Sequence, residues 1–209
     1  MLRKDIDSFL KTIPNNIILV AATKYLTAAE LDELYLHNIK NYGENRVDSF
    51  LMKYEYFSNK KDVTWHFIGH LQRNKAKQVI NKIDYLHSLD SLDLAKIIEK
   101  ERIKPLKTFI EVSINLEESK NGVPYYEMKE FVRELLKYQK IELVGLMMMA
   151  VKGSLNTEEQ FHKLKVLRDE LEKEFDIKIP YLSMGMSDDY ESAIKEGATH
   201  IRLGRILYK

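Results

Sequence analysis

The chain has 209 residues, and its 33 Lys and Arg nearly balance its 32 Asp and Glu, which gives a formal net charge of +1. So small a net charge excludes the strong positive field that attracts nucleic acid or an anionic membrane surface. The absence of Cys excludes disulfides, thiolate metal sites and a cysteine nucleophile.

The N-terminal sequence and the length of the apolar runs bear on location. The start MLRKDIDSFLKTI is too charged for a signal peptide. No apolar run approaches the roughly 18 residues that a membrane-spanning helix needs. We therefore expect a cytoplasmic protein without a membrane partner.

Eight short apolar runs alternate with stretches of helical spacing. The runs begin near Ile17, Asn41, Thr64, Asp84, Lys107, Ile141, Pro180 and His200. Strands that alternate with helices are typical of βαβ units, and eight such units predict a closed (β/α)8 barrel of the TIM type. The length suits a single domain over residues 1–209, and the pattern over residues 2–12 adds an extra N-terminal helix before the barrel.

Capping residues mark the boundaries of several helices. Thr27 is followed three residues later by Glu30, which is the pattern of a capping box. Ser187 is a suitable N-cap for the last helix, and Gly197 is a suitable residue just past its end. In between, apolar spacing predicts helices after residue 45, near 74, and over 91–102, 128–135 and 157–175.

Two loops near the end of the chain predict a phosphate site. Barrels of this type frequently bind phosphate with the loops after their last two strands. The first loop, Ser183-Met184-Gly185-Met186-Ser187, combines a glycine that permits close approach with a hydroxyl beside helical N–H groups. The second loop reads Arg202-Leu203-Gly204-Arg205. Each loop alone suits a simple cap or turn, but together they favour phosphate, although Asp188 and Asp189 would repel a dianion if they faced it.

A lysine stands at the end of the first predicted strand. Lys24 follows the apolar run Ile17–Ala22, so we expect it at the barrel mouth, partly removed from water and able to form a Schiff base. A lone lysine is most simply a solvated one, and Lys24 stands out only because the phosphate loops lie opposite. A mouth lysine and a phosphate cradle together suit pyridoxal 5′-phosphate, with Arg202 able to meet the pyridine nitrogen.

Other polar residues near the predicted mouth have plainer interpretations. His66, His70 and His87 lie there, but no carboxylates accompany them at metal-ligand spacing, so we predict no metal. His66 alternates with its apolar neighbours and suits a hydrogen-bonded barrel residue better than a base. Met147 to Met149 suit barrel packing.

Three further cations remain as candidates. Lys120 is the one rival to Lys24, because a mobile lysine at the mouth can pair with the phosphate or accept the aldehyde. Arg73 and Lys75 can bind phosphate at the helix near residue 74, but they suit a solvated surface equally well.

Motifs along most of the chain resemble those of the pyridoxal phosphate homeostasis proteins, also called the YggS or PROSC family. The matching stretches are Ala22–Lys24, Tyr42–Asn45, Trp65–Lys75, Ser88–Asp90, Ser119–Gly122, Gly145–Met147, Leu182–Ser187 and Ile201–Gly204. The Trp-His-Phe-Ile-Gly and Ser-Met-Gly-Met-Ser stretches are the most specific. The resemblance implies a barrel related to the N-terminal domain of alanine racemase.

The resemblance also implies a cofactor site. It assigns Lys24 to the Schiff base with pyridoxal 5′-phosphate and Arg202 to the pyridine nitrogen. The other implied site residues contact the phosphate or line the ring pocket: Ser187, Gly204 and Arg205 for the phosphate, Asn45 and Met184 for the ring.

The role that the resemblance implies is to bind the cofactor and supply it to other enzymes, with pyridoxal-phosphate-dependent apoenzymes as transient partners. No robust catalysis is implied. The alternative is a racemase-like enzyme with weak activity, but two-base racemisation needs an acid or base on each face of the substrate. Racemases take one of these groups from a second domain, which we do not expect here, so we also expect a monomer. A third alternative is an unrelated sugar-phosphate barrel enzyme with Lys24 as an aldolase-type lysine.

Overall fold

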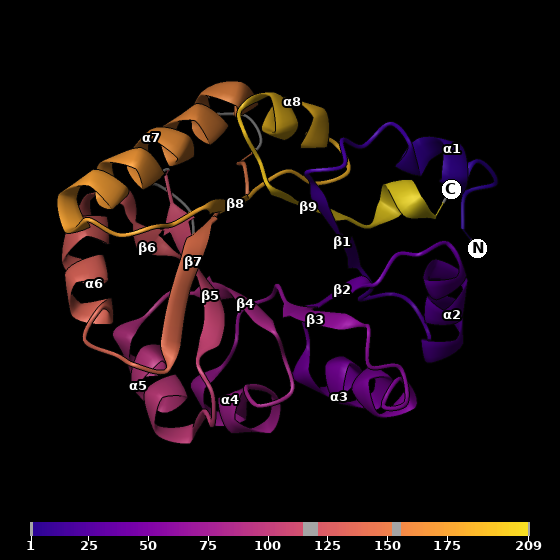
Figure 1. Ribbon diagram of the computed structural model, residues 1–209, viewed down its shortest axis with the longest axis horizontal. Coiled ribbons are helices and arrows are strands. Elements are labelled where there is room, and N and C mark those ends of the chain that lie inside the picture. The colour runs from indigo at the N-terminus through magenta and orange to yellow at the C-terminus, as the bar shows by residue number, and fades with distance from the viewer. Residues whose placement is uncertain (1, 115–120, 152–155, 209) are drawn as a thin grey trace.

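The structure is a computed structural model that describes residues 2–114, 121–151 and 156–208. Its central feature is a closed barrel of parallel strands (Figure 1), as the alternating pattern predicted. The barrel strands, in their order around the ring, are β1 (Ile18–Ala22), β2 (Asn41–Glu44), β3 (Thr64–Phe67), β4 (Tyr85–Leu89), β5 (Leu106–Ser113), β7 (Ile141–Met147), β8 (Tyr181–Ser183) and β9 (His200–Leu203). Pairing of β9 with β1 closes the ring, and the two-residue strand β6 (Val123–Pro124) pairs with β5 beside it.

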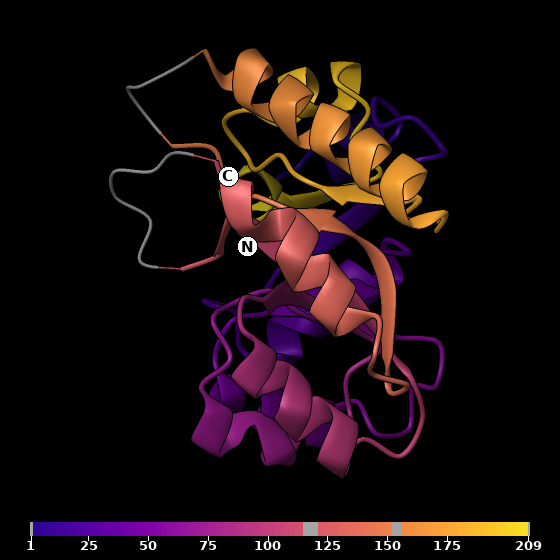
Figure 2. The same cartoon turned by 90° about the vertical axis from the view of Figure 1, so that its left-hand side faces the viewer.

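Helices surround the ring on its outer side. They are α1 (Ile6–Leu10), α2 (Ala28–Leu36), α3 (Val47–Tyr56), α4 (Arg73–Val79), α5 (Leu92–Glu101), α6 (Met128–Leu135), α7 (Thr157–Phe175) and α8 (Tyr190–Lys195), with short 3-10 turns η1 (Tyr125–Glu127) and η2 (Arg205–Leu207). Figure 2 faces α6 and α7 and shows both outside the barrel. In the described part of the chain, no helix is long and apolar enough to cross a membrane.

The two ends of the chain lie side by side (Figure 1). The Arg3 backbone N–H donates to the Leu207 carbonyl at 3.0 Å, and the Arg3 side chain donates to the Ile206 carbonyl. The predicted helix before the barrel is therefore present as α1. The segment that precedes α1 is hydrogen-bonded to η2 through Arg3.

Local sequence signals set some helix boundaries. At α2 the Thr27 hydroxyl accepts from the Glu30 N–H, and the Glu30 carboxylate accepts from the Thr27 N–H at 2.8 Å, which confirms the capping box. Ser91 caps α5 in a similar way. Gly197 lies just past α8 with a φ of +96°, a conformation that glycine adopts without strain.

The prediction that Ser187 caps the last helix is wrong. Helix α8 begins at Tyr190, with Asp189 as its N-cap residue. The Ser187 hydroxyl turns instead toward the backbone N–H groups of Gly204 and Ile206, each at 3.4 Å. These amides follow β9, so the Ser187 hydroxyl accepts hydrogen bonds from a segment distant in the sequence and not from the first turn of α8.

The outer layer between the strands and the helices is apolar. Trp65 packs its ring against Tyr42, Phe50 and Phe57, with ring centroids 5.4 to 6.4 Å apart. These residues are all less than 9% exposed and belong to one large apolar cluster. This layer is where the hydrophobic effect holds the helices onto the barrel.

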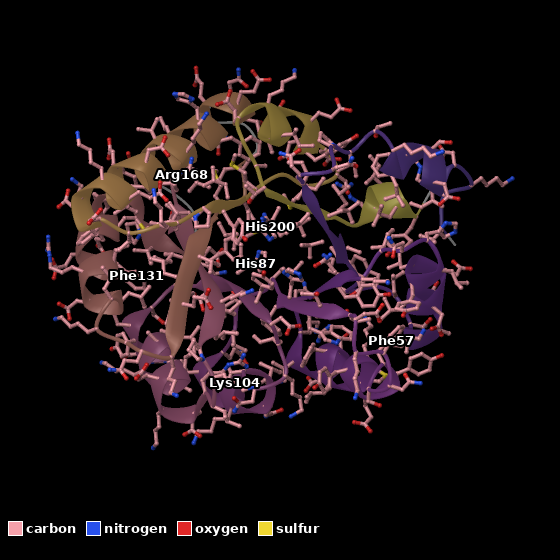
Figure 3. All side chains as sticks on the ribbon, in the orientation of Figure 1. Phe57, His87, Lys104, Phe131, Arg168 and His200 are labelled. Atoms are coloured by element: carbon pink, nitrogen blue, oxygen red, sulfur yellow. The ribbon has the colours of Figure 1, made fainter. Side chains whose placement is uncertain are left out.

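The interior of the barrel has a different composition. Bulky aliphatic side chains usually fill such barrels. Here Phe109, Val144 and Met147 form only a small apolar cluster, and buried histidines pack beside it: His66, His87 and His200. Figure 3 shows His87 and His200 at the centre of the ring, far from Phe57 in the outer layer. His66 faces inward while Trp65 faces out, so the two lie on opposite faces of the strand, as the alternation predicted.

Candidate functional site at the barrel mouth

The carboxyl ends of β1, β2 and β9 meet at one side of the barrel mouth. Ala21 is in register with Leu203 across β1 and β9, and Ala22 with Gly43 across β1 and β2. The residues that follow these strand ends are therefore neighbours. Three predicted site residues come together in this way: Lys24, Asn45 and Gly204.

Lys24 lies just past the end of β1 and is exposed. Its Nζ is 4.5 Å from the centre of the Tyr25 ring, and Tyr25 itself is 82% exposed. This differs from the partly desolvated lysine that we expected from the sequence. The amine is open to a ligand that approaches from solvent.

A buried charged group fixes the backbone immediately before Lys24. The Lys53 ammonium donates to the Thr23 carbonyl at 2.6 Å and to the Glu44 carboxylate at 2.5 Å, and the Thr23 hydroxyl donates to the same carboxylate. Lys53 is 2% exposed, and Glu44 and Thr23 are fully buried. A buried ion pair of this kind orders its surroundings, and removal of one partner is strongly destabilising.

Sequence reasoning missed the role of Glu44 and Lys53. One signal was available, because Lys53 lies three residues after Phe50 and six after Val47, on the apolar face of α3. A lysine on such a face needs a buried partner.

The two loops from which we expected a phosphate cradle meet at the Ser187 hydroxyl. The N–H groups of Gly204 and Ile206 converge on this hydroxyl, whereas the family resemblance assigned Gly204 and Arg205 to the phosphate. Both distances, 3.4 Å, are at the long end for hydrogen bonds, so these donors are only weakly satisfied.

The acidic residues beside the cradle both have hydrogen-bond partners. Asp188 accepts from the exposed Arg205 guanidinium at 2.7 Å. Asp189 accepts from the Met186 N–H at 2.6 Å. These contacts reduce the repulsion between the carboxylates and a bound dianion that we considered from the sequence. The Arg205 side chain forms an ion pair with Asp188.

Gly185 is required for the local backbone conformation and close packing, independently of any ligand. Its φ is +94°, and a Cβ there would lie 2.6 Å from the Ala193 Cβ on α8. Its carbonyl accepts from the Arg202 N–H at 2.9 Å. Close packing of the loop against α8 and β9 thus requires glycine at this position.

Arg202 lies inside the barrel near the mouth and is only 5% exposed. Its Nη1 donates to the Ser183 hydroxyl at 2.7 Å, and its Nη2 donates to the Met148 carbonyl at 2.8 Å. Burial lowers the pKa of Arg202 to about 10, although the negative charges of Glu111 and Asp189 act in the opposite direction. The guanidinium remains charged at neutral pH.

Glu111 is a buried carboxyl on β5 that sequence reasoning also missed. It is 6% exposed, and burial raises its pKa to about 6, with a further rise from the negative charge of Asp90. The positive charge of Arg202 opposes this rise. The available signal was a single acid in the apolar run that continues from Phe109 to Val112.

The two residues predicted to line the ring pocket differ in their surroundings. The Asn45 side-chain oxygen is buried and has no hydrogen-bond partner in the described part of the chain. Met184 is fully buried in the apolar core, and its N–H donates to the His200 carbonyl at 3.1 Å. Asn45 therefore offers an unsatisfied acceptor, and Met184 offers packing.

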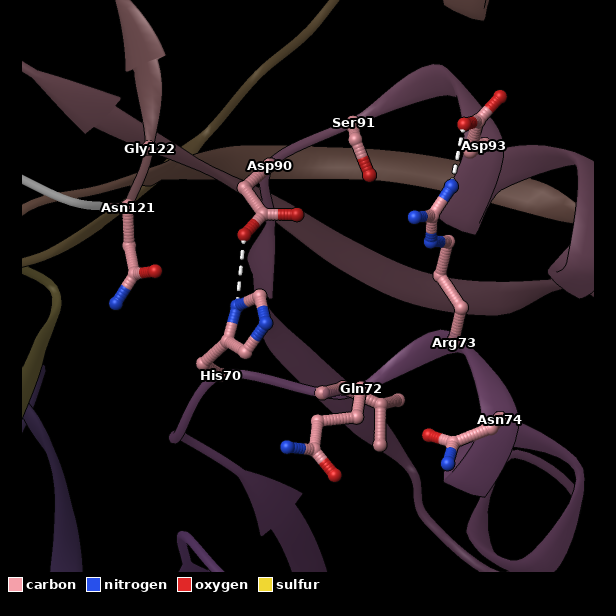
Figure 4. A pocket seen from close by; sticks show the side chains of 10 residues that line it. His70, Gln72, Arg73, Asn74, Asp90, Ser91, Asp93, Asn121 and Gly122 are labelled. Carbon is pink, nitrogen blue, oxygen red and sulfur yellow. Dashed lines mark hydrogen bonds and ion pairs between the residues drawn. The ribbon is translucent and has the colours of Figure 1, made fainter.

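A cavity of about 740 Å³ lies beside the loops after β3 and β4 (Figure 4). Its charged side chains are paired with one another. His70 bonds to Asp90 at 2.9 Å, and Arg73 bonds to Asp93 at 2.6 Å. Lys75 is likewise paired, with Asp48 at 3.2 Å. Arg73 and Lys75, which we considered as phosphate ligands, therefore already have acidic partners. The rival lysine Lys120 lies outside the described residues.

Comparison with known proteins identifies the family. A family model described as the alanine racemase N-terminal domain matches residues 16–209. A pyridoxal phosphate homeostasis protein from Aquifex aeolicus is 40% identical over 195 residues, which cover 91% of this chain and 85% of that protein. The chain belongs to the pyridoxal phosphate homeostasis protein family. Another member, from Synechocystis sp., is 34% identical over 204 residues and covers 95% of this chain and 94% of its own.

Solved structures extend the comparison of this family member to three dimensions. PipY from Synechococcus elongatus PCC7942, solved with pyridoxal phosphate bound, gives a TM-score of 0.91 at 30% identity over 98% of this chain and 100% of PipY. PipY without the cofactor gives 0.93 at 30% identity over 100% of both chains. An alanine racemase from Clostridium difficile 630 gives 0.78 at 16% identity and shares the fold, with 99% of this chain matching 57% of the racemase.

Proposed function

We propose that this family member is a cytoplasmic monomer that binds pyridoxal 5′-phosphate through a Schiff base on Lys24 and supplies the cofactor to other enzymes. One observation carries the proposal: a strand-end lysine, a convergent pair of backbone amides and a buried arginine meet at one barrel mouth. The shared name of the relatives and the PipY structure with bound pyridoxal phosphate support this choice of ligand.

The residues around Ser187 fit a phosphate group. The N–H groups of Gly204 and Ile206 point at one spot and hold only a neutral hydroxyl at 3.4 Å. A phosphate oxygen is a stronger acceptor than a hydroxyl and would shorten such bonds. The Ser187 hydroxyl can then donate its own hydrogen to the same group.

Lys24 and Arg202 fit the other two parts of the ligand. When bound, pyridoxal phosphate supplies an aldehyde that condenses with a primary amine and releases water. The exposed Nζ of Lys24 supplies that amine. Arg202 has only N–H donors, so a ring nitrogen facing it is held as an acceptor and stays unprotonated. An unprotonated ring is a weaker electron sink, which disfavours strong carbanion stabilisation and so favours storage over catalysis.

The binding proposal is tested by titrating the purified protein with pyridoxal 5′-phosphate and recording its visible absorbance. We expect the wild type to develop the absorbance of a lysine adduct, and Lys24→Ala to lose it while far-UV circular dichroism stays unchanged. Lys75→Ala, which removes another mouth-side lysine, is the matched control and should keep the signal. An unchanged spectrum in Lys24→Ala would direct attention to Lys120.

Supply of the cofactor is tested separately. The loaded protein is mixed with an apoenzyme that needs pyridoxal phosphate, and the return of activity is compared with that from the same concentration of free cofactor. Faster or more complete return in the presence of a scavenger for free cofactor supports direct transfer. Equal rates in every condition would reduce the role to storage.

The racemase alternative and the oligomeric state have simple measurements. Incubation of the loaded protein with single enantiomers of amino acids should leave their optical purity unchanged. Steady loss of optical purity would instead assign weak racemase activity. Sedimentation of the loaded and unloaded protein should give the mass of one chain.

A further inference from the structure

A chain of hydrogen bonds runs through the barrel interior to Arg202. The Arg202 Nη1 lies 2.7 Å from the Ser183 hydroxyl, which lies 2.8 Å from the Nδ1 of His87. The Nε2 of His87 lies 2.9 Å from the Nδ1 of His66. The Nε2 of His66 lies 3.0 Å from the side-chain oxygen of Asn41. Five strands from opposite sides of the barrel are linked in this way: β9, β8, β4, β3 and β2.

The chemistry of the members gives this relay a single direction. The Arg202 guanidinium has only donors, and at the other end of the relay the Asn41 side-chain oxygen can only accept, so His66 donates to it from Nε2. A neutral imidazole has one donor and one acceptor, so His66 accepts at Nδ1 from the Nε2 of His87. His87 then accepts at Nδ1 from the Ser183 hydroxyl, whose oxygen accepts from Arg202. Every link is satisfied only in this one arrangement.

Both relay histidines are fully buried, and burial lowers the pKa of each well below its ordinary value. Neighbouring positive charge acts in the same direction, since His200 lowers the pKa of His66, and His66, His200 and Arg202 lower that of His87. Neutral imidazoles at neutral pH are what the one-way arrangement requires.

We propose that His87 and His66 are positioning residues that fix Ser183, and through it the guanidinium of Arg202, for the ring nitrogen of the bound cofactor. The relay uses one N–H of Arg202 on Ser183, and Met148 takes a second, which leaves the remaining N–H groups for a ligand. This inference rests on the proposed function for its ligand, but the relay itself belongs to the protein alone.

His200 provides a matched control inside the same cluster. Its ring centre is 6.0 Å from that of His87 and 6.2 Å from that of His66, and it is equally buried. Its Nδ1 contacts the Thr199 hydroxyl at 3.0 Å, and its Nε2 has no hydrogen-bond partner in the described part of the chain. A variant at His200 thus disturbs the packing of the barrel interior but does not remove a member of the relay.

The first test uses the protein without cofactor and reads imidazole nitrogen resonances by NMR. We expect His87 and His66 both to carry their hydrogen on Nε2. In Asn41→Ala, where the acceptor that imposes the direction is removed, His66 and His87 should populate both tautomers. A hydrogen on Nδ1 of either histidine in the wild type would overturn the relay, whatever the protein binds.

The second test compares cofactor retention in three variants. His87→Phe removes both links and should weaken retention of pyridoxal 5′-phosphate about tenfold and shift its visible absorbance, because Arg202 loses its fixed orientation. His87→Gln keeps one donor and one acceptor and should recover most of the loss. His200→Phe should bind and absorb as the wild type does.

The outcomes separate the two ideas. If His87→Phe and His200→Phe retain the cofactor equally well, with identical spectra, the positioning role is wrong and the proposed function stands. If the wild type itself binds no pyridoxal phosphate, the proposed function and the positioning role fail together, and the NMR result still decides the relay. Should His87→Phe not fold, cofactor retention is compared between His87→Gln and Ser183→Ala instead. Weaker retention in Ser183→Ala supports the positioning role, and equal retention contradicts it.

Discussion

The two faces of strand β3 show how differently the outer layer and the barrel interior are built. Trp65 faces outward into rings that contain no charge, whereas His66, the next residue, faces inward into a hydrogen-bonded relay. The outer layer holds the fold by burying apolar area. The interior holds a small number of polar groups in fixed orientations beneath the mouth. Changes on one face should therefore alter stability, and changes on the other should alter ligand binding.

The largest expected effect is on the outer layer. Trp65→Ala removes the ring that packs on Tyr42, Phe50 and Phe57, and should lower the free energy of unfolding by roughly 3–5 kcal/mol. Denaturant unfolding measures this loss. Cofactor affinity of the molecules that remain folded should not change, and a weaker affinity would mean that the two faces are coupled.

A comparable loss is expected where charge is buried behind the mouth. Glu44→Ala leaves the Lys53 ammonium buried without its carboxylate and should cost about 3 kcal/mol of unfolding free energy. Asp32→Ala, which breaks the partly exposed pair with Lys60, is the control and should cost less than about 1 kcal/mol. Equal losses in the two variants would contradict the structural importance of the Glu44 pair.

A smaller effect is expected at the cradle. Ser187→Ala should weaken cofactor retention by roughly 1.5–3 kcal/mol, because one hydrogen bond to a charged phosphate is lost. Ser192→Ala, on the surface of α8, should leave retention unchanged. Equilibrium dialysis compares the two, and unchanged affinity in Ser187→Ala would show that the backbone amides alone hold the phosphate.

The smallest expected effect concerns pH. The pKa of Glu111 is raised from 4.5 to about 6, so the folded protein binds this proton more tightly than the unfolded chain does. Its contribution to stability is therefore present below about pH 4.5 and is lost as pH rises through about 6. Glu111→Gln should be more stable than the wild type at neutral pH, by at most about 2 kcal/mol. Unfolding measured across this range should show a flatter pH profile for the variant, and parallel profiles would contradict the raised pKa.

The sequence predicted the parts of this molecule that depend on short-range patterns. The strand and helix alternation, the Thr27 capping box and the placement of His66 on the face opposite Trp65 all follow from short-range spacing. The Ser187 cap failed because its hydroxyl meets amides 17 and 19 residues further along, which no local signal encodes. The relay was out of reach for the same reason, since His87 and Ser183 are 96 residues apart.

The predicted site residues themselves remain predictions. The structure brings Lys24, Asn45, Ser187, Arg202 and Gly204 to one mouth, which is what the strand-end argument required. It does not make Lys24 a buried lysine, and it pairs the Arg205 side chain with Asp188.

The most direct measurement is borohydride reduction of the purified protein in the presence of pyridoxal 5′-phosphate, followed by peptide mass mapping. A stable adduct on Lys24 is the predicted result, and it would place the cofactor at the mouth formed by β1 and β9. An adduct on another lysine would move the site, and a folded protein without any adduct would contradict the account of this barrel as a pyridoxal phosphate carrier.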